Sequence, residues 1–166
     1  HAVIGENGAG KSTMMNIILG DLRRDSGEIL FKGKPVEFKS PADAIAAGIS
    51  MIHQETSLVP TLSVAENIWL HREKRFITAG LIDLKKRDKA TDELLHNKLE
   101  LNIHENDIIS NLTVAQCQLV ELARAVSCDS DVIIMDEPTS SLSDKEVAVL
   151  FKIIHHLTEQ GVAIIF

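Results

Sequence analysis

The sequence predicts an α/β protein, because short β-branched runs alternate with segments that have the spacing of amphipathic helices. A glycine-rich stretch, 5–13, separates the first apolar run from a helical pattern at 14–22. Apolar runs of strand length lie at 2–4, 48–53, 132–135 and 162–166. Because such continuous apolar runs are typical of buried parallel strands, we expect one parallel sheet covered by helices.

The stretch 5–13 reads Gly-Glu-Asn-Gly-Ala-Gly-Lys-Ser-Thr and contains the complete pattern G-x-x-x-x-G-K-[ST]. A strand before it and a helix after it let backbone N–H groups and the helix N-terminus face an anion. Lys11 supplies a cation for the β and γ phosphates, and Ser12 a hydroxyl for Mg²⁺. A chance glycine-rich turn is the simpler alternative. The residues expected to hold a nucleoside triphosphate are Gly5, Glu6, Asn7, Gly8, Ala9, Gly10, Lys11, Ser12 and Thr13.

Two carboxylates follow the apolar run 132–135, which is the form of a Walker B element. The carboxyl ends of parallel strands lie beside the ligand crevice, so Asp136 is expected in the Mg²⁺ shell and Glu137 at the attacking water. We therefore predict Glu137 as the general base. In isolation, an acidic turn closed by Pro138 would be the better interpretation.

Gln54 follows the predicted strand 48–53 and leads into a more polar helical region. Its amide is suited to touch both Mg²⁺ and the water, and to release them when the nucleotide state changes. Gln54 is therefore a catalytic and metal candidate, with an ordinary loop residue as the alternative.

The remaining segments predict one domain, 1–166, with a helical subdomain at about 63–127 inserted into the α/β core. Short alternating segments around 32–34 predict an antiparallel hairpin. Predicted apolar helix faces comprise Val64, Ile68 and Trp69; Leu84, Leu94, Leu95 and Leu99; Leu119, Leu122, Ala123 and Val126; and Val147, Leu150, Phe151 and Ile154. The last helix is expected to begin at the capping-box sequence 143–146 and to end at Gly161.

The chain of 166 residues has a formal net charge of -7, which disfavours general nucleic-acid binding. No apolar run is long enough to cross a bilayer, so we expect a soluble protein whose membrane role would come through a partner. Cys117 and Cys128 lie near the two ends of one predicted helix, too far apart to be bridged. His155 and His156 are expected on a solvated helix face without a metal role.

With the phosphate loop, Gln54 and Asp136-Glu137 in this order, the chain resembles the nucleotide-binding domain of an ABC transporter, which implies the RecA-like core of P-loop NTPases. In that family a signature motif, usually Leu-Ser-Gly-Gly-Gln, completes the site of an opposing domain. Its counterpart here is Leu112 followed by Thr113, Val114, Ala115 and Gln116. Thr113 keeps the hydroxyl, and a plain helix cap is its simpler role. Val114 and Ala115 replace the glycine pair, but backbone N–H groups at a helix N-terminus can still donate hydrogen bonds when the residues carry side chains.

The Val-Ala signature, together with the runs 51–55, 62–68 and 120–125, resembles the ATP-binding proteins of bacterial ribose- and galactose-type sugar importers. This resemblance implies ATP and Mg²⁺ as cofactors and a peripheral position at the cytoplasmic face of the bacterial cell membrane. It also implies a second nucleotide-binding domain in the same polypeptide, membrane permease subunits and, indirectly, a sugar-binding protein. The family's D-loop aspartate is replaced by Ser143.

The chain begins and ends abruptly, so we expect a fragment truncated at both ends. By resemblance, the adenine-stacking aromatic residue would precede His1 and the switch histidine would follow Phe166, so the isolated fragment is expected to be weak or inactive. The insert from Glu55 to about Gly80 would receive a coupling helix of the permease. Trp69 and Phe76 are candidates for that contact, against the commoner case of packing within their own subdomain.

Two other functions remain open at this stage. A soluble ABC-type ATPase of DNA repair or chromosome maintenance shares these motifs, but such proteins usually carry coiled-coil or zinc-bearing insertions, and 63–111 has neither heptads nor paired cysteines. A regulatory nucleotide-binding module that does not hydrolyse is disfavoured by Glu137 and favoured by the departures at Val114, Ala115 and Ser143.

Overall fold

A parallel sheet at the centre of the molecule carries the elements that end at the predicted site. The computed structural model describes residues 1–6, 8–53, 57–139 and 142–166. The sheet has the order β3-β6-β7, formed by β3 (Ile49–Ile52), β6 (Val132–Met135) and β7 (Ala163–Ile165). Both pairings are parallel. The predicted parallel sheet is therefore confirmed for these three strands.

The first residues of the chain extend the hydrogen-bonding pattern beyond β7. The Val3 N–H donates to the Phe166 carbonyl at 2.6 Å, and the Phe166 N–H donates to the His1 carbonyl at 3.1 Å. This alternation is that of a parallel pair. Residues 1–3 are not a fully buried strand as predicted, because they lie beside a single neighbour and Ile4 is 93% exposed. The phosphate loop and β6 nevertheless leave the sheet at the same edge.

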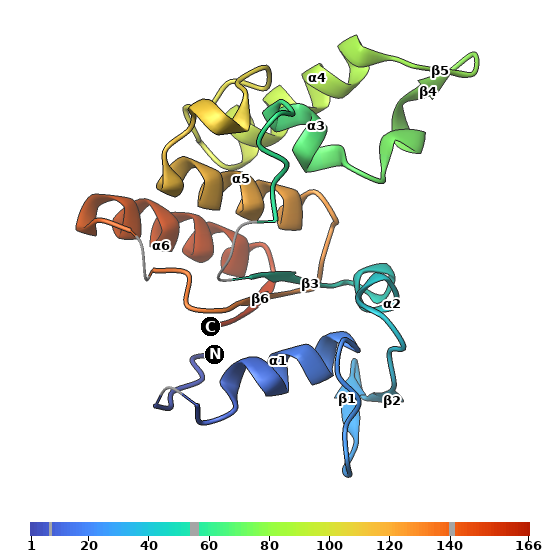
Figure 1. The fold of residues 1–166 in the computed structure, drawn as a ribbon, viewed down its shortest axis with the longest axis vertical. Helices are drawn as coiled ribbons and strands as arrows, with labels where there is room; N and C mark the ends of the chain where they lie inside the picture. Colours follow the sequence, from blue (N-terminus) through green and yellow to red (C-terminus); the bar gives the residue numbers. More distant parts are fainter. Residues whose placement is uncertain (7, 54–56, 140–141) are drawn as a thin grey trace.

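Helices cover both faces of the sheet (Figure 1). On one face lie α1 (Lys11–Leu19) and α2 (Pro41–Ala47), and on the other lie α5 (Val114–Val126) and α6 (Asp144–Glu159). Side chains of β6 alternate between the two layers: Ile134 packs with Met15 and Leu19 of α1, whereas Ile133 and Met135 join the larger core. The sheet therefore separates two apolar cores.

An antiparallel hairpin lies beyond α1, formed by β1 (Ile29–Phe31) and β2 (Lys34–Val36). Lys32 and Gly33 have φ values of 51° and 74°, which suits the tight turn that matches the twist of a hairpin. The hairpin prediction is confirmed, with a connection one residue shorter because Lys34 belongs to β2.

The region between β3 and α5 forms a helical layer at the top of Figure 1. It contains α3 (Val64–Trp69) and α4 (Leu84–Asp92), which continues into a π-helical turn, η2 (Glu93–Lys98). Two 3₁₀ turns, η1 (Glu73–Phe76) and η3 (Ile109–Asn111), and a second small hairpin, β4 (Ile77–Thr78) and β5 (Leu81–Ile82), complete it. The sequence pattern did not predict this hairpin. None of the described helices is both long and apolar enough to span a bilayer.

Three helix-face predictions need correction. Leu84 is 54% exposed, because it lies in the first turn of α4, away from Leu94 and Leu95. In α6 the buried stripe is Leu150, Ile153, Ile154 and Leu157, whereas Phe151 is 44% exposed and Val147 only half-buried. Both stripes have helical spacing, and packing against β7 selects the one rotated toward the sheet. The face of α5 is wider than predicted and includes Cys117, while Leu119 is only half-buried.

The cysteines and the histidine pair lie as the sequence pattern predicted. Cys117 and Cys128 are free cysteines, and His155 and His156 are exposed on α6. Burial raises the pKa of the Cys117 thiol, which favours the uncharged form.

Candidate functional site

The glycine-rich loop before α1 is held open by backbone conformations that favour glycine. Gly8 and Gly10 have φ values of 83° and 92°, and a Cβ at either position would meet nothing within 4 Å. Gly10 caps α1, and its carbonyl accepts a hydrogen bond from the Met14 N–H at 2.9 Å. There is therefore open space beside Gly8 and Gly10 at the N-terminus of α1, and an anion bound at a helix N-terminus needs such space. Asn7 lies outside the described residues.

Lys11 bends back over this loop. Its Nζ donates to the Gly5 carbonyl at 2.8 Å and to the Glu6 carbonyl at 3.3 Å. Ser12 and Thr13, in the first turn of α1, are exposed. The structure thus places the Lys11 ammonium group over the loop, and Ser12 and Thr13 in the helical turn that follows it.

The two carboxylates after β6 have different surroundings. Asp136 is 9% exposed, and its N–H donates to the Ile52 carbonyl at 3.1 Å, which extends the β3–β6 pairing by one bond. Glu137 is exposed and has a φ of 49°, a left-handed conformation that turns the chain out of the sheet. Such conformations cluster at functional sites. A sheltered Asp136 suits a metal ligand, and an outward Glu137 suits contact with a water. Gln54 lies outside the described residues.

Oxygen donors of the kind that Mg²⁺ prefers lie at this edge. Mg²⁺ is usually held by one or two carboxylates, substrate phosphates and waters rather than by a protein cage. Among the described residues there is accordingly no cluster of three or more His, Cys, Asp or Glu side chains of metal-binding type. The Asp136 carboxylate and the Ser12 hydroxyl fit that partial donor set.

The signature segment lies at the N-terminus of α5. The Thr113 hydroxyl accepts a hydrogen bond from the Gln116 N–H at 3.2 Å, and Gln116 Oε1 accepts one from the Thr113 N–H at 2.9 Å. The structure thus shows the helix cap considered above, and the Thr113 hydroxyl still has a hydrogen to donate. Val114 is 57% exposed. Because α5 and α1 lie on opposite faces of the sheet (Figure 1), this segment and the phosphate loop flank different sides of the domain.

A buried carboxylate in α5 was missed by the sequence analysis. Glu121 is 3% exposed and accepts hydrogen bonds from the Ser57 N–H at 2.7 Å, the Ser57 hydroxyl at 3.1 Å and Arg124 at 3.1 Å. The available signal was an acidic residue between the apolar Val120 and Leu122. Glu121 joins the helix of the signature segment to the chain just beyond 54–56.

A groove of about 540 Å³ lies between α2, β3, α5 and the residues that follow α3. It is lined mainly by apolar atoms, and its lining includes Ile45, Ala46, Met51 and Ala125. Ser50 is 3% exposed, and its hydroxyl lacks a hydrogen-bond partner among the described residues. The groove therefore combines apolar walls with a buried hydroxyl.

Arg72 contributes charge to one side of this groove. Its Nη2 donates to the Ser127 hydroxyl at 2.7 Å and to the Ile68 carbonyl, whereas the buried Nη1 lacks a hydrogen-bond partner among the described residues. Burial is the main cause that lowers the pKa of Arg72. One wall of the groove thus contains a guanidinium whose buried Nη1 lacks a hydrogen-bond partner among the described residues.

Trp69 and Phe76 pack within the helical layer rather than on its surface. Their ring centroids are 4.9 Å apart in an edge-to-face arrangement, and the residues are 6% and 4% exposed. The indole N–H donates to the Thr91 hydroxyl at 2.9 Å. The candidate role of both rings in a permease contact is therefore corrected in favour of the packing alternative.

Comparison with known protein families decides the classification. Residues 1–140 match the family described as "ABC transporter". The chain belongs to this family. Its nucleotide-binding core is a P-loop NTPase fold, and this ABC domain is similar over its length to proteins named for sugar import.

Two relatives illustrate this similarity. A "putative ribose/galactose/methyl galactoside import ATP-binding protein" of Pseudomonas fluorescens is 52% identical over 99% of the ABC domain. A "galactose/methyl galactoside import ATP-binding protein MglA" of Clostridium tetani is 52% identical over the whole chain. The ABC domain spans 32% and 33% of the lengths of these relatives.

Solved structures agree with the ABC fold. A nucleotide-free ATP-binding cassette from an ABC transporter superimposes with a TM-score of 0.81 at 25% identity, covering 99% of this chain and 68% of that one. A dimeric ATP-binding cassette in a post-hydrolysis state, bound to ADP and Pi, has a TM-score of 0.78 at 25% identity, covering 99% and 72%. The mixed sheet-and-helix architecture is therefore that of an ATP-binding cassette.

Proposed function

We propose that the chain is an ATP-binding and ATP-hydrolysing domain that energises uptake of a ribose- or galactose-type monosaccharide through a membrane permease. The observation that carries the proposal is that the phosphate loop and Asp136-Glu137 leave one parallel sheet at the same edge. The import function is supported by the names of relatives that are about half identical to the chain. Those names also disfavour the alternative of a soluble ATPase of DNA repair.

In this proposal each residue has a role that its position allows. The loop N–H groups and Lys11 bind the β and γ phosphates, which replace the Gly5 and Glu6 carbonyls as partners of Nζ. Ser12 and Asp136, with Gln54, would hold Mg²⁺, which neutralises charge that develops on the phosphates. Glu137 orients the attacking water toward the γ-phosphate and accepts a proton from that water.

The site is completed by a second nucleotide-binding domain, proposed to lie in the same polypeptide. Thr113, Val114, Ala115 and Gln116 would present a hydroxyl and helix N–H groups to the nucleotide of that opposing domain. The exposed start of α5 supports this arrangement. Ser143 would stand at the D-loop position, where it already caps α6 through Glu146.

The proposed permease contact is the groove between α2, β3 and α5. Its volume of about 540 Å³, its apolar walls and the buried Ser50 hydroxyl suit a short amphipathic helix. This contact would place the protein at the cytoplasmic face of the bacterial cell membrane, with the sugar-binding protein as an indirect partner.

The hydrolytic part is tested by single-turnover hydrolysis in the full-length protein with Glu137→Gln. We expect nucleotide binding to persist and product formation at this site to fall by about a thousandfold, because the loop is intact and the base is removed. Glu28→Gln, an exposed carboxamide control, should leave the rate unchanged. Product formation that does not depend on Glu137 would support a regulatory, non-hydrolysing module instead.

The permease part is tested with Ala46→Trp, which places an indole in the groove from the exposed face of α2. We expect co-purification with the permease to be lost while basal ATP hydrolysis is retained. Leu30→Trp, on the distant β1–β2 hairpin, is the matched control. Retained co-purification of Ala46→Trp would reject this groove as the contact.

A further inference from the structure

Apolar side chains gather at the exposed β4–β5 hairpin. Of the twelve large apolar side chains that are exposed in the described chain, four fall within residues 77–84. They are Ile77, Leu81, Ile82 and Leu84, with exposures of 49%, 77%, 45% and 54%. Single exposed apolar residues are ordinary, but four within eight residues, of which Ile77 and Ile82 are cross-strand partners, indicate an interaction site. We call this group the apolar tip.

The hairpin that carries the apolar tip has a firm base. Phe76, just before β4, packs edge-to-face on Trp69, and its carbonyl accepts a hydrogen bond from the Asp83 N–H at 2.8 Å. Asp83 then caps α4 by accepting a hydrogen bond from the Lys86 N–H at 3.0 Å. The tip is therefore presented by an ordered base and projects from the body of the molecule (Figure 1).

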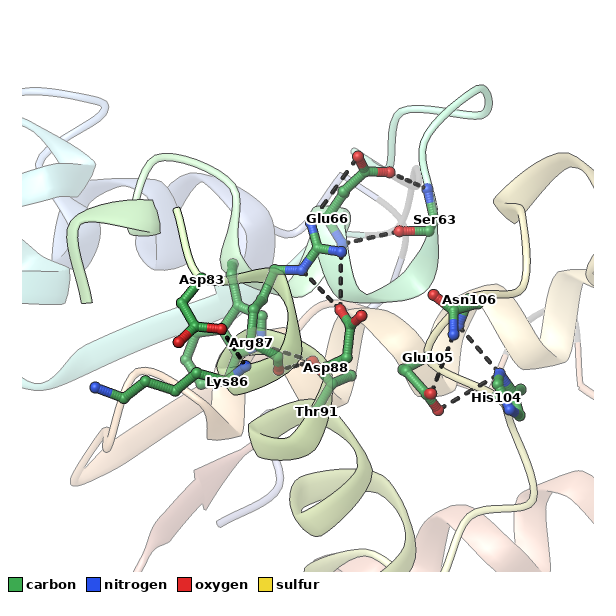
Figure 2. Close-up of polar contacts among 11 residues, drawn as sticks. Ser63, Glu66, Asp83, Lys86, Arg87, Asp88, Thr91, His104, Glu105 and Asn106 are labelled. Atoms are coloured by element: carbon green, nitrogen blue, oxygen red, sulfur yellow. Dashed lines mark hydrogen bonds and ion pairs between the residues drawn. The ribbon is translucent and has the colours of Figure 1, made fainter. Parts of the chain in front are cut away.

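A polar cluster anchors α4 behind the hairpin. Arg87 donates to Asp88 at 2.9 and 2.8 Å and lies 3.9 Å from Glu66 of α3. Figure 2 shows this cluster between α3 and α4, with the Lys86 side chain extending away from it. The Arg87–Glu66 ion pair thus links α4 to α3, and the residues of the first turn of α4, Leu84, Lys85 and Lys86, are exposed.

Cations flank the apolar tip on both sides. Residues 74–86 contain Lys74, Arg75, Lys85 and Lys86 but only one acidic residue, Asp83, in a chain whose net charge is -7. Lys85 and Lys86 lie in the first turn of α4, which holds no acidic residue. Positive charge at a helix N-terminus opposes the helix dipole, so folding does not explain these lysines.

We propose that the β4–β5 hairpin inserts its apolar tip into the interface of an anionic phospholipid membrane, with Lys74, Lys85 and Lys86 contacting the headgroups. A projecting apolar tip beside cations has the chemistry of interfacial membrane anchors. A pocket on a partner protein would need a matching cavity, whereas a lipid surface needs only a convex tip and complementary charge. The proposal goes beyond nucleotide hydrolysis and permease docking, because lipid is the partner.

Flotation of the full-length protein with vesicles tests the proposal without any permease. Binding is expected with vesicles that contain phosphatidylglycerol and not with pure phosphatidylcholine vesicles. Leu81→Ser should weaken binding about tenfold, and Lys85→Gln with Lys86→Gln about fivefold for each lysine. Leu30→Ser, which removes a leucine that is 58% exposed on the other hairpin, should bind like the unaltered protein.

The outcomes separate this proposal from the proposed function. Loss of vesicle binding in the tip variants with unchanged ATP hydrolysis supports the membrane contact, because it excludes misfolding. Absence of binding to anionic vesicles, or equal binding by Leu81→Ser and Leu30→Ser, overturns it. Loss of hydrolysis in Glu137→Gln concerns only the nucleotide site and leaves the vesicle result to be judged by itself.

Discussion

The Glu121 side chain connects two parts of the chain that are far apart in sequence. Its carboxylate accepts hydrogen bonds from the backbone and hydroxyl of Ser57 and from Arg124 while it is nearly inaccessible to water. Removing it would leave the part-buried Ser57 N–H without its acceptor and the Arg124 guanidinium with only the Ser57 hydroxyl of these two partners. Breaking such a pair from one side costs more than the pair itself contributes.

We therefore expect Glu121→Ala to lower the free energy of unfolding by about 3 kcal/mol. Glu121→Gln keeps an acceptor of similar shape and should lose less. Urea unfolding followed by circular dichroism measures both, with Glu28→Ala as a surface control expected within about 0.5 kcal/mol of the unaltered protein. Equal stability of the alanine and control variants would contradict the buried role.

At this scale the sequence predicted the phosphate loop and the paired carboxylates but not Glu121. The loop residues and Asp136-Glu137 are contiguous, so their chemistry is visible in a local pattern. Glu121 acquires its role from Ser57, 64 residues away, and that partner is visible only in the folded chain. The roles of Asn7 and Gln54 remain predictions, because both lie outside the described residues.

At the scale of elements, α5 shows why some boundaries are predictable. It extends over Val114–Val126, because Thr113 and Gln116 cap one end and the apolar stripe that the sequence predicted reaches Val126 at the other. The β4–β5 hairpin was missed because each strand has two residues and its turn places Ala79, a residue uncommon there, at a φ of 52°. Short strands carry too little periodicity to be recognised.

Thr113→Ala should lower the free energy of unfolding by about 1 kcal/mol, because the Gln116 N–H loses its acceptor at the start of α5. Thr113→Ser keeps the hydroxyl and should restore most of the loss. Thermal unfolding of the pair measures the cap. Hydrolysis by the two full-length variants tests the second role. If Thr113→Ala loses hydrolysis and Thr113→Ser retains it, the hydroxyl also has the proposed role in the opposing site.

The cap of α3 makes a pH-dependent contribution. Hydrogen bonds from Ser63 to the Glu66 carboxylate, aided by Arg87, lower the pKa of Glu66 below its ordinary value of 4.5. A lowered folded-state pKa stabilises the protein above the unfolded value, and this stability is lost as pH falls through the folded one.

Glu66→Gln preserves the capping geometry and removes only the charge. We expect it to lower the free energy of unfolding by less than about 1 kcal/mol at pH 7, since the side chain is 42% exposed. The difference should shrink below pH 4.5. Urea midpoints compared across this range measure it, and a difference that grows on acidification would contradict the assigned cause.

For the whole molecule, nucleotide should act as a ligand of the folded state alone. With MgATP at about a hundred times its dissociation constant, folding gains about 2.7 kcal/mol. For a domain of the size of this chain, the gain corresponds to a rise in melting temperature of roughly 5 to 10 °C. Lys11→Ala should remove the part of the shift that comes from this phosphate loop, and chelation of Mg²⁺ should reduce the shift. If Lys11→Ala leaves the shift unchanged, the nucleotide does not bind at this phosphate loop.

The overall architecture was predicted more completely than its surface. Alternation of strands and helices indicated the parallel sheet, and the comparisons agree with the predicted class. Sequence patterns do not show which convex or concave surfaces result, because the groove beside Ser50 and the apolar tip each join residues from several elements.

The protein contains one tryptophan and no tyrosine, so its intrinsic ultraviolet emission arises almost entirely from Trp69. That indole is enclosed in the helical layer against Phe76, with the guanidinium groups of Arg72 and Arg75 beside its ring. The phosphate loop, at the other side of the sheet, contributes no fluorophore. A change in emission on addition of nucleotide would therefore be an optical record of rearrangement in the helical layer, obtained without any label.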